Sequence, residues 1–169
     1  MTKASDKNAT EPYGCKQLRF VIRSANHGDI DRCSELLAML FKEEHEFSPD
    51  QENQHRGLGM ILDNPSSGTV IVCEDTWNRS IPAMTVLLYT ISTALGGKAG
   101  ILEDMIVDPS YRSHGIGSKM LRHALELAEK TGLERVTLLT DGDNVKAHEF
   151  YRKNGFIRSD MTVFRKILA

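Results

Sequence analysis

The chain lacks a long apolar run, and its first residues contain no apolar segment. Among its 169 residues the longest unbroken apolar run is Leu36–Phe41, whereas about 20 residues are needed to span a bilayer. The polar beginning, MTKASDKNATEP, lacks the apolar core of a secretory signal. These absences predict a cytoplasmic protein that has no membrane partner.

Cysteine is scarce, because the chain has only Cys15, Cys33 and Cys73, which lie far apart. An odd number at this spacing fits neither a disulfide framework nor a paired-cysteine zinc site. The histidines form no HExxH pattern, and His45 and His55 have no ligand partner four residues away. We therefore expect buried or incidental thiols and no metal.

Neither sign of charge is in excess, since 21 Lys and Arg face 23 Asp and Glu, for a net charge of −2. This balance gives no electrostatic reason to expect a nucleic-acid partner. A hydrophobic fraction of 40% and a charged fraction of 26% are typical of a globular protein. Residues 1–17 are small, polar and charged, so we expect a flexible tail before a single domain over 18–169.

Hydrophobic periodicity predicts an α/β chain in which strands and helices are mixed along the sequence. Alternating or β-branched apolar runs indicate strands, and apolar residues three or four apart indicate helices. Gly132 and Gly155 stand where helix C-termini are expected. The predicted order is a strand at 18–23, a helix from about 29 to 46, a short helix around 58–62, strands at 69–73, 83–92 and 100–107, a helix at 117–131, a strand at 136–140, a helix at 144–154, and final strands at 156–158 and 161–167.

A glycine-containing loop, DPSYRSHGIGS from Asp108 to Ser118, joins the strand at 100–107 to the next helix. A helix N-terminus presents free N–H groups and positive partial charge, and Gly115 and Gly117 allow an anion to approach closely. A Walker A loop is excluded because Gly97-Lys98 is followed by alanine, and a Rossmann fingerprint because Met120 replaces the third glycine. The glycine pair alone is equally compatible with a structural turn.

A second pattern lies further along the chain and reads N-x-x-A-x-x-F-Y-x-x-x-G-F from Asn144 to Phe156. Together with R-x-x-G-x-G from Arg112 to Gly117, it resembles the GNAT superfamily of acetyl-CoA-dependent N-acetyltransferases over residues 18–167. The resemblance implies an α/β fold with a mixed, mostly antiparallel central sheet of six to seven strands with a splay. About four helices are expected to flank this sheet.

The resemblance also implies which residues hold acetyl-CoA as a co-substrate. Backbone amides of the glycine loop would hold the pyrophosphate, and the splayed strand would pair with the pantetheine arm. Tyr151 would protonate the departing thiolate, the alternative being a purely structural core aromatic. The implied coenzyme-binding residues are Met105, Ile106, Val107, Arg112, Ser113, His114, Gly115, Ile116, Gly117, Ser118, Asn144, Ala147 and Tyr151.

Two adjacent carboxylates, Glu103 and Asp104, lie in the predicted strand at 100–107. In a regular strand adjacent side chains point to opposite faces, so the two cannot share one pocket. The stretch LED-x-x-V looks like the matching strand of polyamine and aminosugar-phosphate acetyltransferases, whose glutamate takes the amine's proton directly or through water. By that match Glu103 is the expected general base, or alternatively a substrate-binding carboxylate. Asp104 is a candidate for the substrate site or for structural pairing.

The acceptor site is expected between the first helix pair and the strands beyond the splay. The candidates there are Phe41, Glu44, His45, Phe47, Tyr89, Asp104, Thr140, Asp141 and Asp143. Their carboxylates favour a cationic acceptor. The predicted function is acetyl transfer to the primary amine of a small molecule, polyamine-like or amino-acid-like, by direct attack in a ternary complex. Transfer to a protein or peptide, and a non-catalytic acetyl-CoA sensor, remain alternatives, and a homodimer is a further implication of the family.

Overall fold

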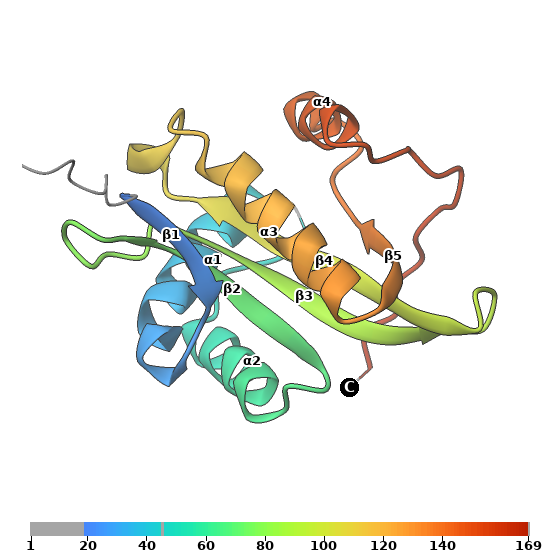
Figure 1. Cartoon of the computed structure of the whole chain (residues 1–169), viewed down its shortest axis with the longest axis horizontal. Helices are drawn as coiled ribbons and strands as arrows, with labels where there is room; N and C mark the ends of the chain where they lie inside the picture. The colour runs from blue at the N-terminus through green and yellow to red at the C-terminus, as the bar shows by residue number, and fades with distance from the viewer. Residues whose placement is uncertain (1–18, 45, 169) are drawn as a thin grey trace, which may run out of the picture.

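The computed structural model describes residues 19–44 and 46–168, in which strands and helices alternate (Figure 1). The predicted tail at 1–17 and His45 lie outside the described residues. In chain order the elements are β1 (Phe20–Ser24), a 3-10 turn η1 (His27–Asp29), α1 (Ile30–Glu43), α2 (Gln51–Asp63), β2 (Gly68–Asp75), β3 (Ala83–Ser92), β4 (Gly97–Val107), a 3-10 turn η2 (Pro109–Tyr111), α3 (Ile116–Lys130), β5 (Leu133–Leu138) and α4 (Val145–Lys153).

The strands form one mixed sheet in the order β1-β2-β3-β4-β5. The first four are antiparallel, and short turns join β2 to β3 and β3 to β4. The fifth is parallel to β4, because α3 carries the chain back to the end from which β4 started. The predicted meander and crossover are therefore confirmed, and β3 has the predicted bounds.

Helices cover the two faces of the sheet. Helices α1 and α2 pack on one face, against Val70, Val72 and other side chains that alternate along the strands. Helix α3 packs on the opposite face, where Ile71 and Cys73 point (Figure 1). The alternation in β2 supplies both cores, which explains why this strand consists of consecutive apolar residues.

A β-bulge interrupts the alternation in β4. The register with β3 shifts between Met84 and Val86, where one residue of β3 opposes two of β4. Leu102 consequently packs on the α3 side, whereas Ile106 packs on the α1 side, although an even spacing of four positions would place both on one face of a regular strand. The extra residue reverses which side chains of β4 face α1 and which face α3 after the bulge. Glu103 and Asp104 lie at the bulge.

The predicted strands at 156–158 and 161–167 are wrong. Residues 156–168 form no strand, so the sheet of the described chain has five strands rather than six to seven. The segment has suitable apolar and β-branched residues, but a strand also needs a neighbouring edge for its backbone groups. Here the segment follows α4, and its Arg165 forms an ion pair with Glu46 in the connection between α1 and α2.

The remaining sequence expectations concern membranes and thiols. No helix in the described ranges is both long and apolar enough to cross a bilayer. Cys33 and Cys73 are free, buried thiols, as expected, and Cys15 lies outside the part of the chain that the structure describes.

Candidate active site

The sheet opens between β4 and β5. The two strands pair from Lys98–Leu133 to Leu102–Leu138, and β4 then continues to Val107 without a partner on that side among the described residues. The edge of β4 over residues 103–107 therefore presents unpaired backbone groups to the opening. This is the predicted splay, and it places Met105, Ile106 and Val107 along one side of a gap in the sheet.

The glycine loop lies at the end of β4, directly before α3. Ser113 and Gly115 both have left-handed backbones, with φ of 68° and 71°, and Gly115 is the N-cap of α3. No side chain caps this helix, so the N–H groups of Ile116, Gly117 and Ser118 remain available to an anion. The Ile116 side chain is buried in the core beneath α3, so only its backbone can serve a ligand.

Contacts with the rest of the chain hold the loop in place. The Arg112 Nε donates a hydrogen bond to the Val107 carbonyl at 3.1 Å, and its guanidinium lies 3.5 Å from Glu43. The His114 Nδ1 lies 2.9 Å from the Arg112 carbonyl, and its ring packs edge-on against Phe20 at 6.1 Å. Both side chains are exposed, so they can also reach a bound anion.

Tyr151 of α4 faces the opening. Its hydroxyl donates a hydrogen bond to the Met105 sulfur at 3.9 Å, and its ring stacks edge-on with Phe150 at 5.2 Å and with Phe156 at 5.7 Å. Burial raises the pKa of the Tyr151 hydroxyl, so the group remains a proton donor at neutral pH. A Cβ built on Gly117 would lie 3.8 Å from Phe150, so α4 also adjoins the start of α3.

Asn144 and Ala147 form the start of α4. The Asn144 side chain is the N-cap and accepts a hydrogen bond from the Ala147 backbone N–H at 3.1 Å. The two predicted coenzyme contacts are thus already paired with one another. The Asn144 side-chain NH2 group makes no hydrogen bond with described residues and remains available to a ligand.

The bulge includes Asp104 and directly follows Glu103, so the two acids do not lie in a regular strand. Asp104 has a left-handed backbone with φ of 53°, and the Thr85 hydroxyl donates to the Glu103 carbonyl at 2.9 Å. Burial, followed by the charges of Glu103 and Glu44, raises the pKa of Asp104 to about 7. The Glu103 side chain is exposed, so Asp104 is the less solvated of the two acids.

An acidic mouth borders the same opening, formed by Glu44 after α1, by Asp141 after β5 and by Asp104. Burial raises the pKa of Glu44, and the charges of Asp141 and Glu46 raise it further, while Arg165 lowers it. Beside this mouth the rings of Phe41 and Phe47 pack at 5.6 Å. Elements far apart in the sequence therefore bring together Phe41, Glu44, Asp104 and Asp141.

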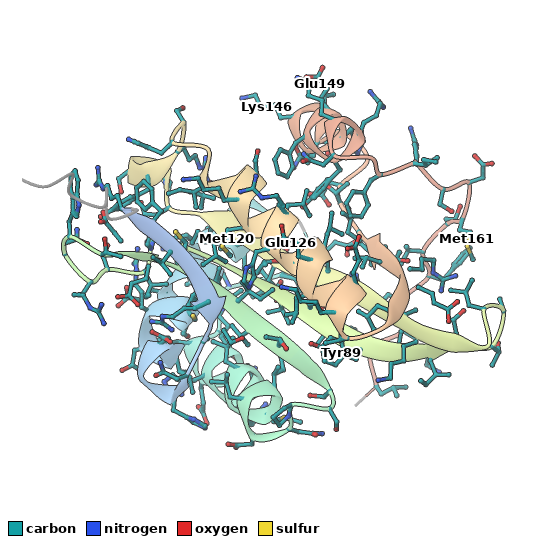
Figure 2. The ribbon with its side chains drawn as sticks, viewed as in Figure 1. Tyr89, Met120, Glu126, Lys146, Glu149 and Met161 are labelled. Carbon is teal, nitrogen blue, oxygen red and sulfur yellow. The ribbon has the colours of Figure 1, made fainter. Side chains whose placement is uncertain are left out.

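Tyr89 does not belong to this group. It pairs with Gly100 at the opposite half of the β3–β4 ladder, and its hydroxyl hydrogen-bonds to Thr69 at 2.7 Å. Figure 2 places it near the C-terminal end of α3, far from the labelled residues of α4. Thr140 and Asp143 lie exposed in the connection between β5 and α4, and neither makes a side-chain contact with the mouth among the described residues.

Sequence reasoning missed Glu46 and Arg165 at the mouth and the sulfur of Met105 beside Tyr151. The ion pair between Glu46 and Arg165 joins residues 119 positions apart, so no local sequence pattern could predict it. The bulge had a signal, because GILEDMIV has two acids side by side followed by three apolar residues. Such a break in a period of two is typical of an inserted residue.

The model of the acetyltransferase (GNAT) family matches residues 30–156, which include the opening, the glycine loop and α4. The chain belongs to this family. It is therefore an acetyl-CoA-dependent acyltransferase, and acetyl-CoA is the co-substrate that the family uses.

Two relatives agree with this membership. The chain is 30% identical over 123 residues to the uncharacterized N-acetyltransferase YhfO of Bacillus subtilis (strain 168), covering 71% of this chain and 80% of the relative. It is 30% identical over 88 residues to glucosamine 6-phosphate N-acetyltransferase of Trypanosoma brucei brucei, covering 52% of this chain and 58% of the relative.

Solved structures support the fold. A possible acetyltransferase from Clostridium difficile 630 is 19% identical and has a TM-score of 0.80, covering 90% of this chain and 99% of that one. A predicted acetyltransferase with acetyl-CoA from Clostridium acetobutylicum is 21% identical and has a TM-score of 0.72, covering 87% of this chain and 96% of that one.

Proposed function

We propose that this acyltransferase moves the acetyl group of acetyl-CoA to the primary amine of a small cationic molecule by direct attack. One observation carries the proposal: Asp104 and the residue that Tyr151 contacts are neighbours in β4. Asp104 directly precedes Met105, whose sulfur accepts the hydrogen bond of Tyr151. A carboxylate that takes a proton and a hydroxyl that gives one thus flank the open edge of β4.

The glycine loop and the edge of β4 are proposed to hold the co-substrate. The fit rests on the uncapped start of α3 and on Gly117, where an added Cβ would meet protein atoms only at 3.8 Å or more. The packing of the protein therefore does not explain this glycine, whereas close approach of a pyrophosphate does. Residues 105–107 of β4 would offer backbone groups to the pantetheine arm, and Arg112 would offer a cation to the pyrophosphate.

The acid pair of β4 is proposed to take the proton of the amine. An alkyl ammonium has a pKa near 10.4, so only about one molecule in 10³ is neutral at pH 7, a deficit of roughly 4.6 kcal/mol. Glu103, the base expected from the family, is exposed. Asp104, with its pKa raised to about 7, is the better matched proton acceptor, and Glu103 helps to raise that pKa.

Tyr151 is proposed to return a proton to the leaving sulfur. Its hydroxyl already donates to a sulfur atom, that of Met105, at the opening. Because burial raises the pKa of Tyr151, the group holds its proton until a strongly basic thiolate forms beside it.

The acceptor is proposed to be polyamine-like or amino-acid-like. Glu44, Asp104 and Asp141 attract an ammonium group, and burial together with the charges of Asp141 and Glu46 raises the pKa of Glu44. The rings of Phe41 and Phe47 suit a methylene chain next to that charge. A phosphate-bearing amine would add negative charge to the same mouth and is disfavoured.

The test is release of free thiol from acetyl-CoA with a panel of amines. The panel contains polyamines, amino acids, aminosugar phosphates and short peptides, and Asp104→Asn and Glu103→Gln run beside the wild type. We expect turnover with the polyamines or basic amino acids and its loss in Asp104→Asn. Turnover confined to aminosugar phosphates or peptides would contradict the proposed acceptor. Binding of acetyl-CoA without turnover of any amine would favour a sensor.

A further inference from the structure

Arg32 lies on α1, the helix that packs on the face of the sheet opposite to α3, yet it contacts the glycine loop (Figure 1). Its Nη2 donates a hydrogen bond to the Asp108 carboxylate at 2.6 Å, and its Nε donates to the Ile81 carbonyl at 3.1 Å. Asp108 directly follows β4, and Ile81 lies two residues before β3. One guanidinium therefore joins the segment that enters β3 to the segment that leaves β4.

This contact lies where the hydrogen bonds between β3 and β4 end. The Asp108 N–H donates to the Pro82 carbonyl at 2.8 Å, one step beyond the last pair of the ladder. The Ile81 carbonyl, one residue further out, accepts its hydrogen bond from Arg32. The guanidinium thus continues the connection between the two strands past their last backbone hydrogen bond, at the point where the chain leaves the sheet and enters the glycine loop.

The Asp108 carboxylate links Arg32 to the rest of the loop. Its Oδ2 accepts from Arg32, while its Oδ1 accepts from the Ser110 N–H at 2.9 Å and from the Ser110 hydroxyl at 2.6 Å. Asp108 is thereby the N-cap of η2, whose C-cap, Arg112, lies three residues before Gly115. Because a rotation of the carboxylate would break this cap, Arg32 fixes the orientation in which the loop begins.

Burial distinguishes this contact from a second ion pair between α1 and the loop. Glu43, at the other end of α1, lies 3.5 Å from Arg112, but the two side chains are 61% and 50% exposed. An exposed pair of this kind contributes little, so Arg112 is free to turn toward an anion. The Arg32 and Asp108 side chains are only 29% and 15% exposed. Their contact can therefore remain in place while Arg112 engages a ligand.

The chemistry of arginine suits this position, because its N–H donors leave one plane in fixed directions. Besides the contacts of Nε and Nη2, its Nη1 donates to Glu35 of the same helix at 2.8 Å. Hydrogen bonds from Ser110, together with the one from Arg32, hold the pKa of Asp108 below its ordinary value, so the carboxylate is charged at neutral pH. A lysine would keep the attraction to Asp108 but could not hold all three partners at these positions.

We propose that Arg32 is a positioning residue for the coenzyme, which holds Asp108 and through it the glycine loop in the geometry that binds the pyrophosphate of acetyl-CoA. The inference rests on the proposed placement of the pyrophosphate at the start of α3. Arg32 acts through the loop, so its loss weakens ligands that carry a pyrophosphate and spares ligands that lack one.

The first experiment compares two thioesters by titration calorimetry, acetyl-CoA and S-acetylpantetheine, which lacks the pyrophosphate and the nucleotide. We expect Arg32→Gln to raise the Kd of acetyl-CoA about tenfold, since a hydrogen bond between charged groups is lost, and to leave the Kd of S-acetylpantetheine unchanged. Arg32→Lys should raise the Kd of acetyl-CoA only about threefold, because the charge is kept.

Arg23→Gln is the matched control for a general loss of stability. Arg23 is 31% exposed and pairs with Asp29 at 2.7 Å, but it lies on β1, at the other edge of the sheet from β5. This variant should lower the melting temperature as Arg32→Gln does and leave the Kd of both thioesters unchanged. Equal weakening of both thioesters by Arg32→Gln, or the same weakening of acetyl-CoA by Arg23→Gln, would mean a merely structural role and overturn the inference.

Asp108→Asn tests the same path even if Arg32→Gln fails to fold. The asparagine keeps an oxygen for Ser110 but presents an NH2 group to Arg32, so the Kd of acetyl-CoA should again rise about tenfold. Adding Arg32→Lys to Asp108→Asn should raise it no further, because the contact is already broken. Effects that multiply in the double variant would show that the two residues act separately and would overturn the inference.

Gly117→Ala separates the role of Arg32 from the coenzyme site itself. If Gly117→Ala weakens the binding of acetyl-CoA and Arg32→Gln does not, the proposed coenzyme site stands and the role of Arg32 is wrong. If neither variant weakens it, the placement of the pyrophosphate and the role of Arg32 are both wrong.

Discussion

The Tyr151 hydroxyl donates a hydrogen bond to the sulfur of Met105, 3.9 Å away, and so links α4 to the open half of β4. This contact joins residues 46 positions apart and places the Tyr151 hydroxyl beside the open edge of β4. The contact directs the hydroxyl toward the open half of β4, which agrees with the proton-donor role proposed for Tyr151.

Replacing Tyr151 with phenylalanine should lower kcat about 10²-fold and leave the affinity for acetyl-CoA almost unchanged, because only the proton donor is removed. Stopped assays of thiol release and a binding titration measure the two quantities. Tyr111→Phe is the matched control, since that hydroxyl contacts Asn78 and Ser80 at 3.1 Å. Unchanged turnover in Tyr151→Phe would remove the assigned role.

The pH profile of kcat/KM should distinguish the two acids of β4. With the pKa of Asp104 at about 7, activity should rise with pH through that value, because only the carboxylate accepts a proton. Asp104→Asn should remove this step and lower the rate about 10²-fold. Glu103→Gln should keep the step but move it to lower pH, since a neighbouring negative charge is lost. The reverse pattern would make Glu103 the base.

Asp104 should also make stability depend on pH. Its pKa is raised in the folded chain above its ordinary value, so its stabilising contribution is complete below about pH 4 and is lost as pH rises through about 7. Asp104→Asn keeps the shape but cannot ionise. The melting temperature of Asp104→Asn should therefore increase relative to that of the wild type as the pH rises from 5 to 8. A gap that stays constant over this range would mean that Asp104 does not titrate there.

Gly117 and Gly115 should respond differently to alanine. At Gly117 the new methyl group meets only ordinary contacts, so helix α3 gains up to about 1 kcal/mol while the KM for acetyl-CoA rises about tenfold. At Gly115 the φ of 71° disfavours alanine, so the chain should lose roughly 1–2 kcal/mol. Thermal melts and acetyl-CoA titrations measure both effects. An unchanged KM in Gly117→Ala would move the phosphate site elsewhere.

Local sequence patterns predicted most of the fold and the part of the site that the two sequence motifs form. Periodicity located the four α-helices and the strands β1 to β5, because each element has to bury one face or both. The glycine loop before α3 and the run from Asn144 to Phe156 identified the family, since they encode backbone conformations and contacts that lie close together in the chain.

Only the tertiary structure decided the rest, because it depends on which residues meet from distant parts of the chain. The bulge opposite Thr85 interrupts the regular strand at Asp104, directly after Glu103, and the sequence pattern alone did not locate it. Burial in the opening, and not the residue type, raised the pKa of Asp104. The segment after Phe156 has the composition of a strand, but a strand exists only where an edge accepts it, and no property of the segment itself supplies that edge.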